Sequence, residues 1–81
     1  MAVSEATAVE AYFGIAGEIA PRRFTWHGST LPVEGVGRCW KEGGERCFAV
    51  LAAGGQPFVL RLDGETLRWR VSRVLARGLA V

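Results

Sequence analysis

The sequence predicts a mostly β fold: an antiparallel meander of five to six strands, curled into a small SH3-like barrel. From Pro21 onward, apolar and polar residues alternate, and glycine-containing turns interrupt this alternation at close spacing. Glycines at positions 35 and 37 would allow a long strand to bend. A chain of 81 residues has the length of one small domain. We therefore expect a single domain over residues 1–81, with no buried active-site cavity.

The turns place five strands at residues 22–27, 30–41, 45–53, 56–62 and 67–72. A two-residue turn at Gly28-Ser29 would set Trp26 opposite Leu31. A similar turn at Gly54-Gly55 would pair Leu51 with Phe58, and the last turn, over residues 63–66, has two or four loop residues.

The hairpin "GRCWKEGGERCF" allows two registers. A two-residue Gly43-Gly44 loop would turn Arg38 toward the core, where an unpaired guanidinium is costly. A three-residue loop over residues 42–44 instead places Cys39 opposite Cys47 inside and turns Trp40 outward. We prefer the second register, because it buries thiols and exposes the cation.

These pairings assign the core, and the ends of the chain follow. The predicted core consists of residues 24, 26, 31, 33, 39, 47, 49, 51, 58, 60, 62, 67, 69 and 71. Residues 8–14 fit a sixth strand at the edge, although alanines and a capping Ser4 also allow a short helix. Residues 1–8 are expected to form a loose extension. After Val71, one helical turn is expected around Val74 and Leu75.

The opposite face of the predicted sheet alternates cations with flat apolar groups. Its candidate binding residues are Arg38, Trp40, Arg46, Phe48, Arg61, Arg68 and Arg70. Bases stack on aromatic rings while guanidinium groups meet phosphates, so this composition suits single-stranded nucleic acid. A second interpretation is that the acidic N-terminal segment, a protein partner or a second copy of the chain covers this face, because small domains seldom leave such a patch bare.

The charge distribution fits either interpretation. The first twenty residues carry a net charge of −3 and the remainder +5, and nine of the ten basic residues are arginine. Arginine suits phosphate and planar groups, but a GC-rich genome also encodes it abundantly.

Catalytic residues, cofactor and metal are not predicted. Cys39, Cys47 and His27 supply one ligand fewer than a structural zinc site needs. If the thiols lie opposite each other, a reversible disulfide is a minority alternative. No apolar run could span a bilayer, and residues 1–20 do not resemble a signal peptide, so we expect a cytoplasmic protein that is not an enzyme.

The segments "PRRFTWHGSTLPVEGV" and "CFAVLAAGGQPFVLRLDGETLRWRVSRV", with the intervening Trp40, resemble a family of small uncharacterised bacterial β domains. The positions that match are Phe24, Trp26, Gly28, Val33, Val36, Trp40, Asp63, Trp69, Arg73 and Val74. Leu31 and Arg70 depart from the pattern, since aromatic residues are usual there. The resemblance covers residues 9–74. Members of this family occur alone or attached to Y-family-polymerase-like proteins, which implies an accessory role linked to DNA repair, with single-stranded nucleic acid or a DNA-repair protein as partner.

Overall fold

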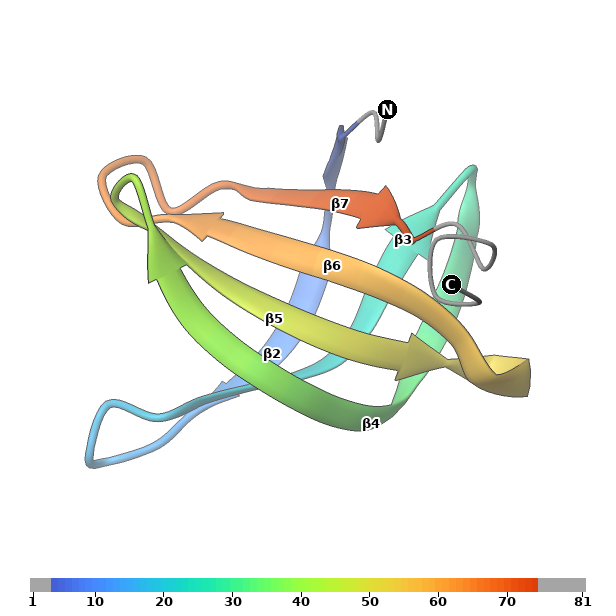
Figure 1. Ribbon diagram of the computed structural model, residues 1–81, viewed down its shortest axis with the longest axis horizontal. Coiled ribbons are helices and arrows are strands. Elements are labelled where there is room, and N and C mark those ends of the chain that lie inside the picture. The colour runs from blue at the N-terminus through green and yellow to red at the C-terminus, as the bar shows by residue number, and fades with distance from the viewer. Residues whose placement is uncertain (1–3, 75–81) are drawn as a thin grey trace, which may run out of the picture.

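The computed structural model describes residues 4–74, which form one seven-stranded antiparallel sheet (Figure 1). The strands are β1 (Glu5–Thr7), β2 (Val9–Phe13), β3 (Ile19–Trp26), β4 (Ser29–Glu42), β5 (Glu45–Ala52), β6 (Gln56–Asp63) and β7 (Trp69–Arg73). A short 3-10 turn, Ala53–Gly55, joins β5 to β6. The spatial order is β1-β7-β6-β5-β4-β3-β2. The predicted mostly β meander is confirmed, with seven strands instead of five or six.

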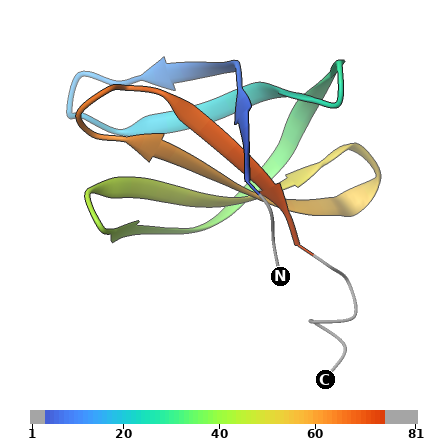
Figure 2. The ribbon, with the colours of Figure 1, turned by 90° about the horizontal axis from the view of Figure 1, so that it is seen from above.

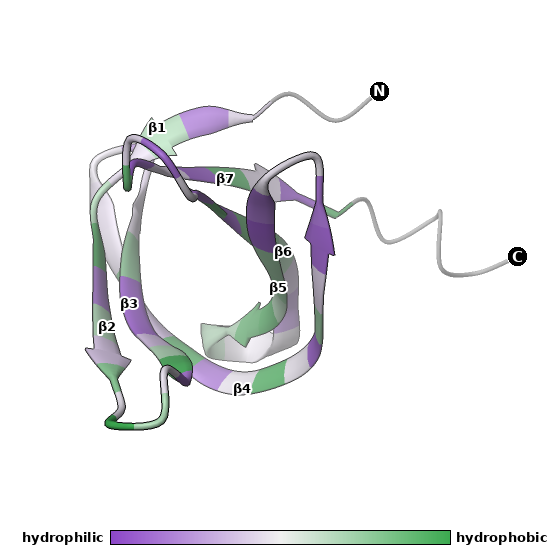
Figure 3. Cartoon of the chain, turned by 90° about the vertical axis from the view of Figure 1, so that its left-hand side faces the viewer, coloured by the Kyte–Doolittle hydropathy of each residue, from purple (hydrophilic) through white to green (hydrophobic). Residues whose placement is uncertain are grey.

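The sheet curls because its two outermost strands are consecutive in the chain. Only Ala8 separates β1, which pairs with β7, from β2, which pairs with β3. The Thr25 N–H donates to the Ala8 carbonyl at 3.1 Å, and the Thr7 hydroxyl donates to the Thr25 carbonyl at 2.6 Å. These bonds bring the two ends of the sheet together in a barrel-like arrangement (Figures 2 and 3).

The N-terminal segment corrects one prediction and decides between two others. Glu5–Thr7 form a strand against Trp69–Val71, so the loose extension expected over residues 1–8 is wrong for these three residues. Val9–Phe13 form the predicted edge strand, and the helical alternative is excluded.

The turn between β3 and β4 lies one residue earlier than predicted. Its central residues are His27 and Gly28, with φ values of 48° and 81°. Consequently Trp26 lies opposite Ser29, and Phe24 lies opposite Leu31. Type I′ turns need positive φ at both central positions, and their twist matches that of the flanking strands. His27 therefore adopts a conformation that is uncommon for a residue with a Cβ atom.

The β4–β5 hairpin uses the two-residue loop, so the predicted three-residue loop is wrong. Gly43 and Gly44 both have positive φ, at 58° and 83°, as a type I′ turn requires. Cys39 now lies opposite Phe48, and Trp40 lies opposite Cys47. Arg38 is exposed in this register, because the residues of β5 that pack in the core, Phe48, Val50 and Ala52, are the even-numbered ones.

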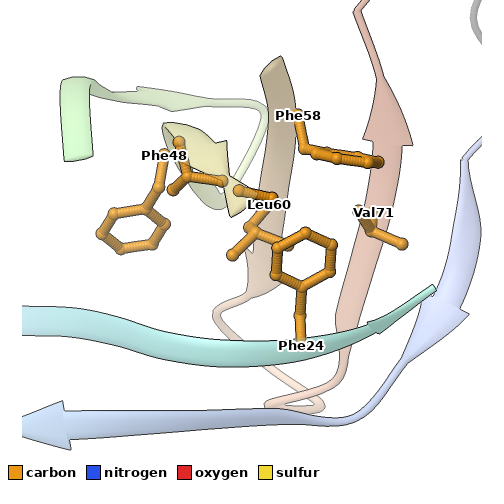
Figure 4. Packing of buried hydrophobic residues seen from close by; sticks show 7 residues of the cluster. Phe24, Phe48, Phe58, Leu60 and Val71 are labelled. Atoms are coloured by element: carbon orange, nitrogen blue, oxygen red, sulfur yellow. The ribbon is translucent and has the colours of Figure 1, made fainter. Parts of the chain in front are cut away.

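The even-numbered residues of β5 face the core, although the odd-numbered ones were predicted to do so. The difference follows from the loop that connects β5 to β6. The loop contains three residues, Ala53–Gly55, and pairs Val50 with Phe58, not Leu51 with Phe58 as predicted. The buried hydrophobic residues are Phe24, Cys47, Phe48, Val50, Ala52, Phe58, Leu60, Leu62 and Val71. All of them except Cys47 and Leu62 belong to one packed cluster (Figure 4). The predicted core positions that are not buried in the structure include Cys39, Ala49, Leu51 and Leu67.

The turn from β6 to β7 is held by the Asp63 side chain. Its Oδ1 accepts hydrogen bonds from the backbone N–H groups of Glu65 at 2.8 Å and Thr66 at 3.0 Å. The Leu67 N–H donates to the Asp63 carbonyl at 2.9 Å, and the Asp63 N–H donates to the Arg68 carbonyl at 2.9 Å. The loop therefore has four residues, as one of the two alternatives predicted, but it spans residues 64–67 and not 63–66. Leu67 has a φ of 58° and is 67% exposed, so the turn points this residue away from the core.

We expect the Asp63→Ala variant to melt at a lower temperature than the native protein at neutral pH, and Asp63→Asn to retain more stability. Hydrogen bonds from the Thr66 and Glu65 backbone lower the pKa of the Asp63 carboxyl below 3.8. A lowered pKa in the folded state adds stability above pH 3.8 that is lost as the pH falls through the folded value. Thermal melts from pH 7 to pH 2 should show the native-to-alanine difference shrinking below pH 3.8. An unchanged difference would contradict this role.

The last described residue after β7, Val74, still pairs with β6. The Val74 N–H donates to the Pro57 carbonyl at 3.0 Å, which continues the β6–β7 pairing by one residue. The helical turn predicted beyond Val74 lies outside the described residues. Within residues 4–74, no helix is long and apolar enough to cross a membrane.

Candidate binding surface

The curl gives the sheet an inner side, which holds the core, and an outer face. Strand pairing places residues in transverse rows across β4, β5, β6 and β7. One row runs through Trp40, Cys47, Arg61 and Arg70, and a neighbouring row runs through Ala49, Val59 and Ser72. We call these rows, together with Leu51 and Pro57 beyond them, the outer face.

An apolar groove of about 360 Å³ occupies one end of the outer face. Its lining residues are Gly35, Val36, Gly37, Ala49, Val50, Leu51, Pro57, Phe58 and Val74. Leu51 and Val36 are 47% and 45% exposed, although both are large hydrophobic residues within strands of the sheet. Gly35 contributes no side chain, and a Cβ atom there would meet nothing within 4 Å. The groove is therefore open to a ligand from solvent.

A second feature of the outer face is a cation stacked on Trp40. The Arg38 guanidinium carbon lies 5.2 Å from the centroid of the Trp40 ring, within the range of a cation–π interaction. The indole N–H donates to Glu42 Oε1 at 3.0 Å. These contacts fix the ring beside the groove, with charges of both signs next to it.

Arg61 lies between this cluster and the buried thiol of Cys47. Its Nη1 is 3.7 Å from Glu42 Oε1 and 3.9 Å from Glu45 Oε1, and it donates to Cys47 Sγ at 3.3 Å. The Arg61 side chain is only 30% exposed. Burial raises the pKa of the Cys47 thiol; Arg61 opposes this rise, whereas the two glutamates add to it. Arg61 therefore already has partners within the domain.

The structure separates the seven predicted binding residues. Phe48 is 2% exposed in the core, because the register of β5 turns even-numbered residues inward. Arg46 lies opposite the buried Leu62, on the inner side, and its Nη1 donates to the Gly17 carbonyl at 3.4 Å. Both were wrongly predicted on the outer face.

The remaining five predicted residues lie on or beside the outer face. Arg61 and Arg70 are cross-strand neighbours, and Trp40 and Arg38 form the stacked pair. Arg68 precedes β7 and is exposed; its carbonyl accepts the Asp63 N–H at 2.9 Å. The outer face thus has basic residues, but Glu42, Glu45 and Asp63 lie among them.

The sequence interpretation missed the residues of the groove. Leu51 and Ala49 were assigned to the core because the β5–β6 turn was given two loop residues. The available signal was the pair Gly35 and Gly37, which was interpreted only as a bend. These glycines leave the groove uncovered on the β4 side.

The two cysteines and His27 do not lie together in one site. Cys39 is exposed, Cys47 is buried, and both thiols are free. His27 Nε2 lies 2.9 Å from Glu5 Oε2, and its ring stacks on Trp26 at 4.1 Å. In the described part of the chain, no three His, Cys, Asp or Glu side chains are grouped so that they could hold a metal ion.

The β2–β3 hairpin also exposes apolar side chains, at the end of the molecule seen at the lower left of Figure 1. Phe13 is 61% exposed, and Ile15 is fully exposed. Their strands carry mixed charges, since Arg23 lies 3.9 Å from Glu10.

Comparisons with protein-family models, with curated proteins and with solved structures found no match to this chain. The resemblance to small bacterial β domains therefore stays a prediction.

Proposed function

We propose that this chain is a non-enzymatic protein-interaction module, an SH3-like barrel that binds a protein partner through the groove and the adjoining outer face. The observation that carries the proposal is the groove itself: an open apolar hollow at one end of the outer face, with Leu51 and Val36 each about half exposed. Apolar patches with polar rims are typical of protein-binding sites.

The surroundings of the groove support a protein more than a polyanion as the partner. Protein interfaces combine an apolar centre with a polar rim, and they are enriched in arginine and tryptophan. Here Trp40 and Arg38 lie beside the apolar centre, while Arg61 is paired with Glu42 and Glu45. The acidic groups would repel phosphates. Following the sequence resemblance, a DNA-repair protein is the first partner to seek.

Single-stranded nucleic acid is the second candidate. It is favoured by the Arg38–Trp40 stack, which offers a flat ring and a cation together, and by the exposed Arg68 and Arg70. If three arginines meet three phosphates, binding should weaken with salt at a log-log slope of about −2. Fluorescence anisotropy with labelled oligonucleotides would detect this. The triple change of Arg61, Arg68 and Arg70 to alanine should then abolish binding.

Site-specific photo-cross-linking tests the protein-interaction proposal. A photoreactive phenylalanine analogue at position 51 should form covalent adducts with a protein when the chain is irradiated in the cells that produce it. The same analogue at position 65, in the exposed β6–β7 turn, should form few or none. Equal adducts from both positions, or no protein adduct from position 51, would contradict the proposal. Nucleic-acid adducts from position 51 would favour the second candidate.

A further inference from the structure

The unpaired edge of β4 lies next to the groove. Ser29–Pro32 pair with β3, whereas the rest of the strand, residues 33–42, pairs with β5 along the opposite edge, with bulges between Val33 and Gly35 and between Val36 and Cys39. Within residues 4–74, no strand pairs with the second edge of residues 33–42. Ten residues exceed the usual length of a whole strand. A free edge of this length carries unpaired N–H and C=O groups and readily pairs with another chain.

We propose that the occupant of this edge is a second copy of the chain, bound antiparallel around a two-fold axis at Val36. This proposal rests on the proposed function and identifies the partner for the same surface. In such a pairing, Val36 meets Val36 of the other copy, Gly35 meets Gly37, and Glu34 meets Arg38. An isologous contact of this kind is the commonest way in which identical chains associate.

Charge complementarity selects this register. The two-fold axis brings Glu34 opposite Arg38 twice, and opposite charges directly across a pair of strands are favourable. Glu34 is exposed, and in the described residues it has no ion-pair partner within the chain. The Arg38 guanidinium carbon lies over the Trp40 ring, 5.2 Å from its centroid, and in the described residues Arg38 has no carboxylate partner within the chain.

The competing registers are weaker. An axis at Arg38 would bring Arg38 against Arg38 and Glu34 against Glu42, which are pairs of like charge. An axis at Trp40 would pair Arg38 with Glu42, but the Glu42 carboxylate already accepts from Trp40 and lies near Arg61. The axis at Val36 places this half-exposed hydrophobic residue, which lines the groove, at the centre of the contact.

Sedimentation equilibrium of the full chain at low ionic strength tests this dimer. The native protein should sediment with twice the mass of one chain. Glu34→Arg and Arg38→Glu should each raise the dissociation constant about tenfold or more, because symmetry places two like-charged pairs in the interface. The double variant Glu34→Arg/Arg38→Glu restores opposite charges and should return the dissociation constant to within about threefold of the native value.

Three results would overturn the inference: a monomer at all concentrations, a dimer unaffected by the single changes, or a double variant that remains as weak as the single variants. Thermal melts of all variants provide the control for folding. A monomer that still cross-links from position 51 to a different protein would refute the dimer and leave the proposed function intact. A dimer in which position 51 cross-links only to the second copy of the chain supports both the dimer and the proposed function.

Discussion

Replacing Phe58 with alanine is expected to lower the free energy of unfolding by about 3–5 kcal/mol. Phe58 is completely buried, and its ring makes edge-to-face contacts with Phe24 at 5.0 Å and Trp26 at 5.1 Å between centroids. It therefore joins β6 to β3 across the curled sheet. Small domains are stable by about 5–15 kcal/mol in total. The change should remove a large fraction of that stability.

Phe13→Ala is the matched control for this experiment. The same side chain is truncated, but Phe13 is 61% exposed at the end of β2, so the expected change is within about 0.5 kcal/mol. Urea unfolding followed by tryptophan fluorescence measures both. Equal losses in the two variants would show that the core does not lie between β6 and β3.

The two cysteines are expected to differ at least about a thousandfold in their rate of reaction with a thiol reagent. Cys39 is exposed and should react at once. Cys47 is inaccessible and accepts a hydrogen bond from Arg61, so it should react only when the domain opens. Opening of a stable small domain is populated at about one part in 10³ or less. A colorimetric disulfide reagent should count one fast thiol in the native protein and two after denaturation.

The pH dependence of Cys47 has a defined sign. Burial raises the pKa of its thiol above 9.0 in the folded state, so folding favours the protonated form. The stability gained in this way is complete below pH 9.0 and is lost as the pH rises through the folded value.

In the thiol-reagent experiment, Cys39→Ser isolates the slow thiol, and Cys47→Ser isolates the fast one. Two thiols that react equally fast in the native protein would contradict the register of β5.

The sequence predicted the class of fold and most turn positions, because glycines and alternating apolar residues are local signals. Gly43, Gly44, Gly54 and Gly55 all lie in turns and all have positive φ. The number of residues in each loop was not predictable in the same way. Two- and three-residue loops use the same glycines, and one residue of difference moves every side chain of a strand to the other face.

Strand β5 shows the consequence. A two-residue loop after it would bury Leu51 and expose Phe48, whereas the three-residue loop buries Phe48 and exposes Leu51. The outer face in the structure therefore lacks Phe48, which was predicted to lie there. It has instead an apolar groove lined by Leu51. Arg61, Arg70 and Trp40 kept their predicted face because their own strands kept their orientation.

Pairing between β1 and β7 could not be predicted from local pattern, since Glu5–Thr7 are only three residues long. Their place depends on contacts distant in sequence, such as those of Thr7 with Thr25 and of Glu5 with His27. The free edge of β4 likewise results from the point at which β3 stops pairing with it.

Cross-linking from position 51, with and without a charge in the groove, tests most directly whether the groove of the outer face binds a protein. Val36→Asp places a carboxylate in the groove at a half-exposed position, so the fold should remain intact. We predict that the protein adduct formed from position 51 is lost in this variant, while its thermal melt stays close to that of the native chain. An adduct of undiminished yield in a folded Val36→Asp variant would show that the partner does not use the groove.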